Sequence, residues 1–432
     1  METLDGVVVV GGGAVGLLTA LKLGKAGIRV VVFEAESGVS PSPRAVTYTP
    51  PTVAVLDRLG LLDDIRKRAV QCPDVAYRHA DGRLIAKMDW DVLAQDTPYP
   101  YMLLLSQHHV SNIIVEHLRT LPNVEIRWNH RVEELEQDDA YVTLHTRGPG
   151  GPTQLRARWV AATDGEHSSV REKLGLTFDG STWPERLVAA NVFYDFSLHG
   201  YSRANFVHDP IDWAVVVQLD HSGLWRLCYE EDPWLSDAEV SQRLHQRLER
   251  LLPGAPTPDQ YRVDCLDPYR VQQRCAAALR RGRVILAGDA AYVSNPMGGL
   301  GLSGGVLDAE HLAQALIAVI NDHAPLTVLN DYADDRKNAF LEFISPSATR
   351  YFTWMKERGP VQRARDLAMF EQAGSERSVM RQFLLDFEKL NGRRSRSVTA
   401  SLGLLTGAVK RVLRQGAQAV SRFWFQRSTS VS

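Results

Sequence analysis

The sequence predicts an α/β fold, in which a Rossmann-like dinucleotide-binding domain carries an inserted antiparallel β-sheet domain and a C-terminal helical region. Three observations lead to this prediction. A run of β-branched residues and a glycine-rich turn open the chain, as in strand-turn-helix units that bind dinucleotides. Apolar and polar residues alternate over several stretches of 181–275, which is typical of antiparallel strands with one buried face. From about residue 340 the periodicity becomes helical.

Length, net charge and cysteine spacing restrict the class of protein to which this chain can belong. The 432 residues suffice for a large core and two domains, and the net charge of -2 does not point to a nucleic-acid partner. The four cysteines lie far apart without a C-x-x-C or Cys/His pattern, so we expect no disulfide framework and no metal site. The first residues, METLD, do not resemble a signal peptide, and no apolar run is long enough to cross a bilayer. These features predict a cytoplasmic protein.

The N-terminal unit carries the pattern of a dinucleotide site. Val7–Val10 is a continuous apolar run, as expected for a strand that is buried on both faces. Gly11, Gly13 and Gly16 follow with G-x-G-x-x-G spacing, which permits a tight turn, a close approach to a pyrophosphate and close helix packing, respectively. The next predicted strand ends at Glu34, about 20 residues further on, where a carboxylate can bind a ribose. An acid at this position favours FAD or NAD over NADP.

Two further predicted strands lead to an acidic residue beside a glycine. The strand at 159–162 leads to Asp164, and the strand at 284–287 leads to Asp289 and then to a glycine-rich helix start. Ligands of open α/β sheets bind at the carboxyl ends of the strands, and helix N-termini attract anionic or electron-rich groups. Each segment by itself could equally be a strand-to-helix turn whose acid caps the next helix.

Taken in order, the segments GGGAVG…E, TDGEHSSVR and GDAAYVSNPMGGLGLSGGVLDAE resemble the fingerprints of the flavin-dependent aromatic hydroxylases. These are single-component monooxygenases typified by para-hydroxybenzoate hydroxylase, and the resemblance covers about residues 5–345. It implies that Asp289 holds the ribityl chain of FAD and that the glycine-rich helix start lies beside the isoalloxazine ring. The cofactor-binding residues that it implies are Gly11, Gly13, Ala14, Gly16, Glu34, Arg44, Gln107, Asp164, Asp289, Pro296, Gly301 and Leu302.

The resemblance also implies how the domains divide the chain. A discontinuous FAD-binding domain is expected at 1–180 and 270–345, and it includes part of a substrate-facing segment at 75–105. A β-sheet substrate domain is expected at 181–269, and C-terminal helices at 346–432. In the family such a sheet roofs the substrate pocket.

The function that the resemblance implies is that of an FAD-dependent monooxygenase. It would use NADPH or NADH and O2 to hydroxylate a phenolic or polyketide-like aromatic molecule through a flavin C4a-hydroperoxide. The cofactor supplies the chemistry, while the protein binds, orients and excludes water. Two alternatives stay open. One is an epoxidase or halogenase on the same scaffold, although the halogenase pattern W-x-W-x-I-P is missing, and the other is a flavin-binding protein that does not turn over.

The third segment departs from the family pattern at three positions. The family reads G-D-A-A-H, then a proline pair, then G-x-G-x-N. This chain has Tyr292 for the histidine, Asn295 for the first proline and Ser303 for the asparagine, while Pro296 is kept. Because the proline pair shapes the space beside the flavin where the substrate lies, Pro296 and Asn295 are the candidate catalytic residues.

Aromatic residues are dense in the predicted sheet domain, and any one of them can be an ordinary core residue. The candidates for contact with the substrate are Phe206, His208, Trp213, Trp225 and Arg226. The expected chemistry needs no protein nucleophile, so we predict no catalytic triad, and the sequence does not identify a general base.

The C-terminal segment carries a basic amphipathic pattern. From Gly392 to the end there are eight basic residues and no acidic ones, and apolar residues from Leu402 to Phe423 lie on one helical face. Such a helix can lie on a membrane surface. We favour the alternative that it packs on its own domain or on the second subunit of a homodimer.

Overall fold

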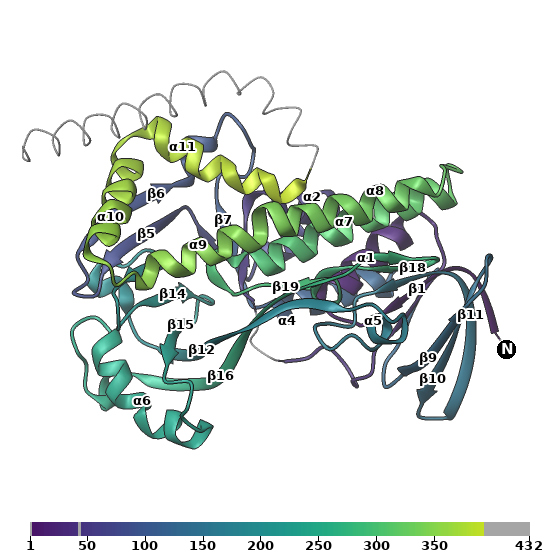
Figure 1. Ribbon diagram of the computed structural model, residues 1–432, viewed down its shortest axis with the longest axis horizontal. Helices are drawn as coiled ribbons and strands as arrows, with labels where there is room; N and C mark the ends of the chain where they lie inside the picture. Colours follow the sequence, from purple (N-terminus) through teal and green to yellow (C-terminus); the bar gives the residue numbers. More distant parts are fainter. Residues whose placement is uncertain (1, 42–44, 393–432) are drawn as a thin grey trace, which may run out of the picture. The chain divides into compact units, whose positions relative to one another are not determined.

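Two large sheets and a series of long helices make up the part of the chain that the structure, a computed structural model, describes: residues 2–41 and 45–392 (Figure 1). Residues up to Leu390 form one compact unit. Arg44 and the basic helix predicted beyond Gly392 lie outside the described residues. Within those residues, no helix combines the length and the apolar character that a membrane span needs.

The first sheet has five parallel strands at its centre, and it brings three of the predicted strand ends together. Val10 of β1 pairs with Ala162 of β11, which in turn pairs with Leu286 of β18. The carboxyl ends of these strands therefore meet at one edge of the sheet, where ligands of open α/β sheets bind. In spatial order the strands are β17 (Arg280–Arg281), β18 (Val284–Leu286), β11 (Gly151–Ala162), β1 (Glu2–Val10), β2 (Val30–Phe33) and β8 (Val124–Arg127), with β10 (Val142–Gly148) and β9 (Arg131–Gln137) added beside β11.

Helix α1 (Ala14–Lys25) follows β1 through the glycine-rich turn and packs against α4 (Gln107–Arg119) and α7 (Leu300–Ile320). The turn requires glycine for a steric reason. A Cβ atom on Gly16 would lie 2.0 Å from the carbonyl oxygen of Gly11, so only a glycine lets the helix start so close to the strand.

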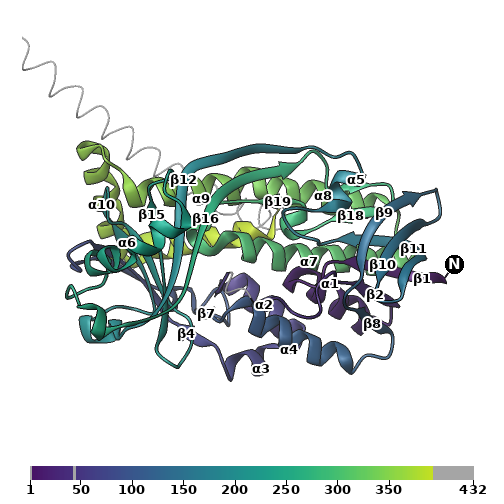
Figure 2. The same cartoon turned by 90° about the horizontal axis from the view of Figure 1, so that it is seen from below.

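The second sheet draws strands from several parts of the chain. Its long strands β12 and β16 pair antiparallel from Phe178 opposite Ala276 to Phe193 opposite Arg262, and they run side by side along the molecule (Figure 2). β13 pairs in parallel with β5, which comes from the segment before α4. The spatial order is β19 (Tyr292–Val293), β16 (Arg262–Ala276), β12 (Phe178–Phe193), β15 (Leu224–Glu231), β14 (Ala214–Gln218), β13 (Ala204–His208), β5 (Asp74–His79) and β6 (Leu84–Asp89).

The two faces of this sheet have different neighbours. Apolar side chains on one face, among them Val216 and Leu227, form a core with α6 (Asp237–Leu251). On the other side, α9 (Ser345–Lys356) packs near β13, and α10 (Pro360–Ser375) packs on β6. The remaining elements are a small sheet of β3 (Thr47–Tyr48), β7 (Met102–Leu104) and β4 (Val70–Cys72), and the helices α2 (Pro50–Arg58), α3 (Leu62–Arg66), α5 (Ser169–Lys173), α8 (Thr327–Ala339) and α11 (Arg377–Leu385), with a π-helical turn at Phe340–Ile344.

Candidate functional site

A cavity of about 740 Å³ lies where the edge of the first sheet, the start of α7, the second sheet and the C-terminal helices meet. We call two parts of its lining the motif wall and the aromatic wall. The motif wall consists of Gly13, Ala14, Gly165, Asp289 and the stretch 298–302 without Leu300. The aromatic wall consists of Tyr77, Phe206, His208, Trp354 and Phe370.

The glycine-rich turn leaves room for a ligand at the N-terminus of α1. Gly11 adopts a φ of 103°, and its N–H donates to the carbonyl oxygen of Phe33 at 2.8 Å. A Cβ atom on Gly13 would meet nothing within 4 Å, and Gly13 and Ala14 line the cavity. Gly11 and Gly16 do not line it, because they serve the turn and the helix packing. The N–H groups at this helix start suit a pyrophosphate.

Glu34 lies in a second, smaller cavity of about 100 Å³, which Gly12, Gly13, Gln107 and His108 also line. The Glu34 carboxylate accepts the N–H of Gly12 at 2.6 Å and the N–H of Glu36 at 2.9 Å. Each carboxylate oxygen can accept a further hydrogen bond, so the residue can still bind ribose hydroxyls. Gln107, the first residue of α4, lines both cavities.

Asp164 and Asp289 occupy corresponding strand ends but have different surroundings. The carboxylate of Asp164 accepts the hydroxyl of Ser168, the N-cap of α5, at 2.6 Å and the N–H of Val170 in the first turn at 3.1 Å, and burial raises its pKa. It does not line the cavity, whereas the following Gly165 does. The side chain of Asp289 is exposed and lines the cavity.

Arg171 connects the segment after β11 to the segment after β18 by hydrogen bonds. Its guanidinium donates to the carbonyl oxygen of Ala290 at 3.0 Å and to that of Glu166 at 2.8 Å, and it lies 3.7 Å from the ring centroid of Phe178. The side chain is buried, and desolvation lowers its pKa. No motif signal showed that it bridges these loops.

A buried hydrogen-bond network supports the segment after β18. Asp308 on α7 accepts the N–H of Gly288 at 2.9 Å, the hydroxyl of Tyr292 at 2.6 Å and Nε of Arg336 at 2.5 Å. The side chains of Asp308 and Arg336 are fully buried. Burial and the nearby Asp308 raise the pKa of Tyr292, so the tyrosine stays protonated and donates. Tyr292, a departure from the family pattern, thus helps to fix the loop that carries Asp289.

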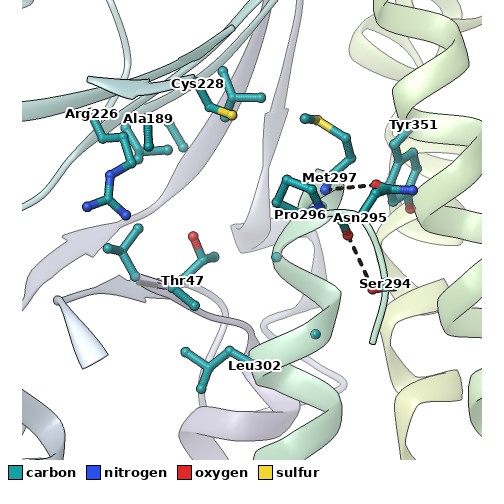
Figure 3. A pocket seen from close by; sticks show the side chains of 18 of the residues that line it. Thr47, Ala189, Arg226, Cys228, Ser294, Asn295, Pro296, Met297, Leu302 and Tyr351 are labelled. Carbon is teal, nitrogen blue, oxygen red and sulfur yellow. Dashed lines mark hydrogen bonds between the residues drawn. The ribbon is translucent and has the colours of Figure 1, made fainter. Parts of the chain in front are cut away.

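Both candidate catalytic residues line the cavity, but they differ in exposure. Pro296 is exposed and lines the cavity near the start of α7 (Figure 3). Asn295 is buried, and its amide donates to Gln273 Oε1 at 3.2 Å and accepts the N–H of Met297 at 3.1 Å. These two bonds fix the turn before α7, and the amide keeps a second N–H and a second lone pair beside the cavity that Asn295 also lines.

The start of α7 presents backbone to the cavity. Gly299 caps the helix with a φ of 65°, in the left-handed region where glycine is favoured. A Cβ atom on Gly301 would meet only Ser294 Oγ at 3.9 Å, so the space beside it is open, and Leu302 also lines the cavity. Ser303 is buried and donates to the carbonyl oxygen of Gly299 at 3.0 Å, so it faces away from that space.

The predicted substrate residues divide into two sets. Phe206, His208 and Arg226 line the cavity, whereas Trp213 and Trp225 do not. Trp225 packs on the α6 side of the sheet, because neighbouring residues of a strand point to opposite faces and Arg226 takes the cavity side. Trp213 packs against Phe352, and its Nε1 donates to Glu230 at 3.1 Å.

Arg226 brings a buried cation to the cavity opposite the start of α7 (Figure 3). Its Nε donates to the side-chain oxygen of Asn191 at 2.9 Å, and desolvation lowers its pKa. Cys228, two residues along the same strand and on the same face, lines the cavity and lies 3.3 Å from the hydroxyl of Tyr269. Burial raises the pKa of this thiol to about 11, so it stays protonated.

Several cavity residues could not be found by motif reasoning. Tyr77 comes from β5, Trp354 from α9 and Phe370 from α10. The ring centroids of Tyr77 and Phe370 are 4.3 Å apart, and those of Trp354 and Phe370 are 5.2 Å apart. The predicted substrate-facing segment at 75–105 includes Tyr77, but nothing in the sequence singled out the two helical aromatics.

Comparison with known proteins places this geometry in a family. The family model described as "FAD binding domain" matches residues 5–344. The chain is 76% identical over 394 residues to the para-nitrophenol 4-monooxygenase of Pseudomonas sp. (strain WBC-3). The matched region covers 91% of this chain and 98% of that relative. It is 42% identical to the 6-hydroxy-3-succinoylpyridine 3-monooxygenase of Pseudomonas putida (strain DSM 28022 / S16), over 81% of this chain and 88% of that protein.

Solved structures agree with this assignment. The crystal structure of p-nitrophenol 4-monooxygenase from Pseudomonas putida DLL-E4 superposes with a TM-score of 0.90 at 76% identity, covering 91% of this chain and 100% of that one. A ternary complex of aklavinone-11 hydroxylase with FAD and aklavinone gives a TM-score of 0.73 at 29% identity, covering 83% and 70%. The expected α/β fold with its added sheet and helices is confirmed.

Proposed function

Because the chain belongs to the FAD binding domain family and is an FAD-dependent aromatic monooxygenase that uses NAD(P)H and O2, we propose that its substrate is a small phenol with a nitro group para to the hydroxyl. The observation that carries the proposal is the identity to a para-nitrophenol 4-monooxygenase over nearly the whole of both chains. The alternatives of an epoxidase, a halogenase and a non-catalytic flavin protein have no support among the relatives described above.

The motif wall suits the cofactor. Open space beside Gly13 and Gly301 gives a pyrophosphate and a flat ring access to backbone N–H groups at two helix N-termini. Asp289 lines the same space with a carboxylate that can accept hydrogen bonds from the hydroxyls of the ribityl chain. We assign Glu34 to the adenosine ribose, and Pro296 and Leu302 to the surroundings of the ring. When bound and reduced, FAD supplies the electrons that activate O2 for transfer of one oxygen atom.

The aromatic wall suits a small flat ring. Its members offer ring faces and edges rather than charges, and they shield the site from water, which protects oxygen transfer from side reactions. Arg226 supplies a buried cation opposite the start of α7, where it can attract the partly negative oxygens of a nitro group or a phenol. The chain thereby binds, orients and encloses the aromatic ring.

The proposed reaction inserts oxygen at the ring carbon that bears the nitro group. A new C–O bond forms there, the C–N bond breaks, and nitrite leaves with the electron pair of that bond. The ring becomes a benzoquinone. One nitrophenol, one O2 and one NAD(P)H then give one benzoquinone, one nitrite, one water and one NAD(P)+. The phenol proton and the hydrogen from the nicotinamide end in the water.

Steady-state turnover tests this proposal. Purified holoprotein is mixed with p-nitrophenol and either NADPH or NADH in air, and nitrite, O2 uptake and nicotinamide oxidation are measured together. We expect about one nitrite per nicotinamide oxidised, and the comparison also identifies the preferred nicotinamide. Oxidation of another phenol, or of 6-hydroxy-3-succinoylpyridine, without any turnover of p-nitrophenol would overturn the substrate assignment and leave the monooxygenase assignment intact.

A cytoplasmic location and a homodimer, with the basic C-terminal segment packed on its own domain or on the second subunit, are further parts of the proposal. The location rests on the four scattered cysteines, which fit a reducing compartment, and the homodimer rests on the amphipathic spacing beyond Gly392. Fractionation of cells and sedimentation of the purified chain, with and without residues 393–432, test them.

A further inference from the structure

His208 stands out among the cavity residues because one of its ring nitrogens has no hydrogen-bond partner in the described part of the chain. It is the last residue of β13, and it lies on the same face of the strand as Phe206, two positions before. Its side chain is buried, with 3% of its surface exposed. Nε2, at the distal end of the imidazole, is covered by protein on the cavity side as well as toward bulk water, and it makes no hydrogen bond to any described residue.

The other ring nitrogen fixes which atom carries the proton. Nδ1 lies 3.2 Å from the carbonyl oxygen of Trp354 on α9. A carbonyl oxygen can only accept, so Nδ1 carries the hydrogen and donates it. Burial lowers the pKa of His208 to about 4, and the ring is therefore neutral near pH 7. In this tautomer Nε2 has a lone pair and no hydrogen, so it can only accept.

The surroundings of the imidazole disfavour a positive charge on it. Arg363 on α10 donates to the main-chain oxygen of His208 at 3.3 Å, and His79 of β5 is the register partner of His208. The rest of the neighbourhood is aromatic, with ring centroids of Phe370 at 5.0 Å and of Tyr77 at 5.7 Å. Burial is the main cause of the lowered pKa of His208, Arg363 and His79 lower it further, and the hydrogen bond to the Trp354 carbonyl oxygen acts in the opposite direction.

A buried acceptor without a partner is costly, because it has lost its hydrogen bond to water and gained none in return. A ligand that brings a donor to this acceptor recovers that loss, while a ligand of the same shape without a donor does not. The surrounding rings favour an aromatic ligand, and the neutral acceptor favours O–H over a carboxylate or another anion.

We propose that Nε2 of His208 accepts a hydrogen bond from the phenol hydroxyl of the substrate and thereby selects hydroxylated rings over rings that lack a hydroxyl. The inference rests on the proposed function, since it places the phenol in the aromatic wall. His208 is then a specificity-determining contact, held in its tautomer by the Trp354 carbonyl oxygen. The ring acts as an acceptor and not as the base of the reaction, because a group this reluctant to take a proton does not hold one from a phenol.

Ligand titration of the oxidised holoenzyme tests this inference without turnover. The absorbance change of the bound flavin reports the dissociation constants of p-nitrophenol and of nitrobenzene, which lacks the hydroxyl. The variants are His208→Phe, which keeps an aromatic ring without an acceptor, and His208→Gln, whose Oε1 can accept. His245→Phe is the matched control, because His245 on α6 bonds to Tyr261 and does not line the cavity. Flavin content and melting temperature verify that each variant is folded.

We expect His208→Phe to weaken p-nitrophenol binding about tenfold and to leave nitrobenzene binding within about twofold, as for the loss of one hydrogen bond. His208→Gln should recover most of the affinity, and His245→Phe should match the wild type. Unchanged p-nitrophenol binding in His208→Phe, or an equal loss for both ligands, would overturn the inference in favour of a packing role.

The test also separates the two proposals. If the wild type binds and oxygenates another phenol but not p-nitrophenol, the substrate assignment fails. The same pair of measurements on that phenol and its counterpart without the hydroxyl then decides the role of His208. A wild type that binds both members of a pair equally overturns the inference.

Discussion

The motif wall and the aromatic wall line one cavity, but they are constructed in opposite ways. The motif wall offers mainly backbone, and its glycines lie in short segments at strand ends and at the start of α7. The aromatic wall offers side chains, and its five residues come from β5, β13, α9 and α10. Cofactor recognition through backbone needs a local conformation, whereas substrate recognition through side chains needs distant segments to meet.

This difference teaches where each kind of specificity can change. A substitution in the motif wall alters a turn or a helix start and affects every substrate alike, because all of them depend on the same cofactor. A substitution in the aromatic wall changes the shape and hydrogen bonding of one pocket and leaves the turns intact. Family members with different substrates are therefore expected to differ mostly in the aromatic wall.

Disruption of the buried Asp308–Arg336 pair, which supports the motif wall, should have the largest effect. Arg336→Met leaves the fully buried Asp308 without its cation, and removal of one partner of a buried pair costs about 3–5 kcal/mol. Because Asp308 also holds Gly288 and Tyr292, we expect loss of flavin together with the loss of stability. Denaturant unfolding and the flavin-to-protein ratio measure both.

Arg119→Met is the matched control for that variant. Arg119 pairs with Glu116 on the surface of α4, where both side chains are 67% exposed, and exposed pairs contribute little. Comparable destabilisation by the two substitutions would show that the network does not support the motif wall in particular.

The pH dependence of the free energy of unfolding tests whether His208 of the aromatic wall is buried as a neutral imidazole. In the unfolded chain His208 takes up a proton near its ordinary pKa of 6.5, but in the folded protein it does so only near 4. Between these values the unfolded state binds more protons, so stability falls as the pH falls, by at most about 3 kcal/mol from this residue. The wild type should therefore lose more free energy of unfolding than His208→Phe between pH 7 and pH 4. Equal slopes for the two proteins would contradict the burial of a neutral imidazole.

The two strand-end acids allow a comparison within the motif region. Asp289→Ala removes a carboxylate from the cavity, and we expect FAD to bind at least about tenfold more weakly, the usual loss for a charged hydrogen bond. Asp164→Ala removes the acceptor of the Val170 N–H in the first turn of α5, which should cost about 1 kcal/mol of stability with little change in FAD affinity. Calorimetric titration of the apoproteins with FAD and thermal unfolding distinguish the roles. If Asp164→Ala also weakens FAD binding tenfold, Asp164 contacts the cofactor as the resemblance implied.

Much of the motif wall could be predicted from the sequence. The spacing of Gly11, Gly13 and Gly16 and the two later strand ends indicated three loops at one sheet edge, and the pairing of Val10, Ala162 and Leu286 brings them there. The assignment of FAD as cofactor is confirmed by the family. The individual cofactor contacts stay predictions, and Arg44 lies outside the described residues.

The aromatic wall was predicted only in part. Phe206 and His208 were chosen for their residue type and their position in a predicted strand, and both line the cavity. Trp225 and Arg226 were both predicted to contact the substrate, but adjacent residues of a strand face opposite sides of the sheet. Which of the two sides faces the cavity depends on the position of α6, which the strand sequence does not encode. Trp354 and Phe370 belong to helices that the motifs do not reach.

The sequence by itself determined the backbone of the cofactor site, because turns and helix starts depend on residues within a few positions of one another. Only the tertiary structure decided the substrate site. Side chains from strands and helices far apart in the chain meet there, and their orientation follows from the pleat of the sheet and the packing of α6, α9 and α10 around it. The neutral, unpartnered nitrogen of His208 is a product of that packing, since burial and the Trp354 carbonyl oxygen create it.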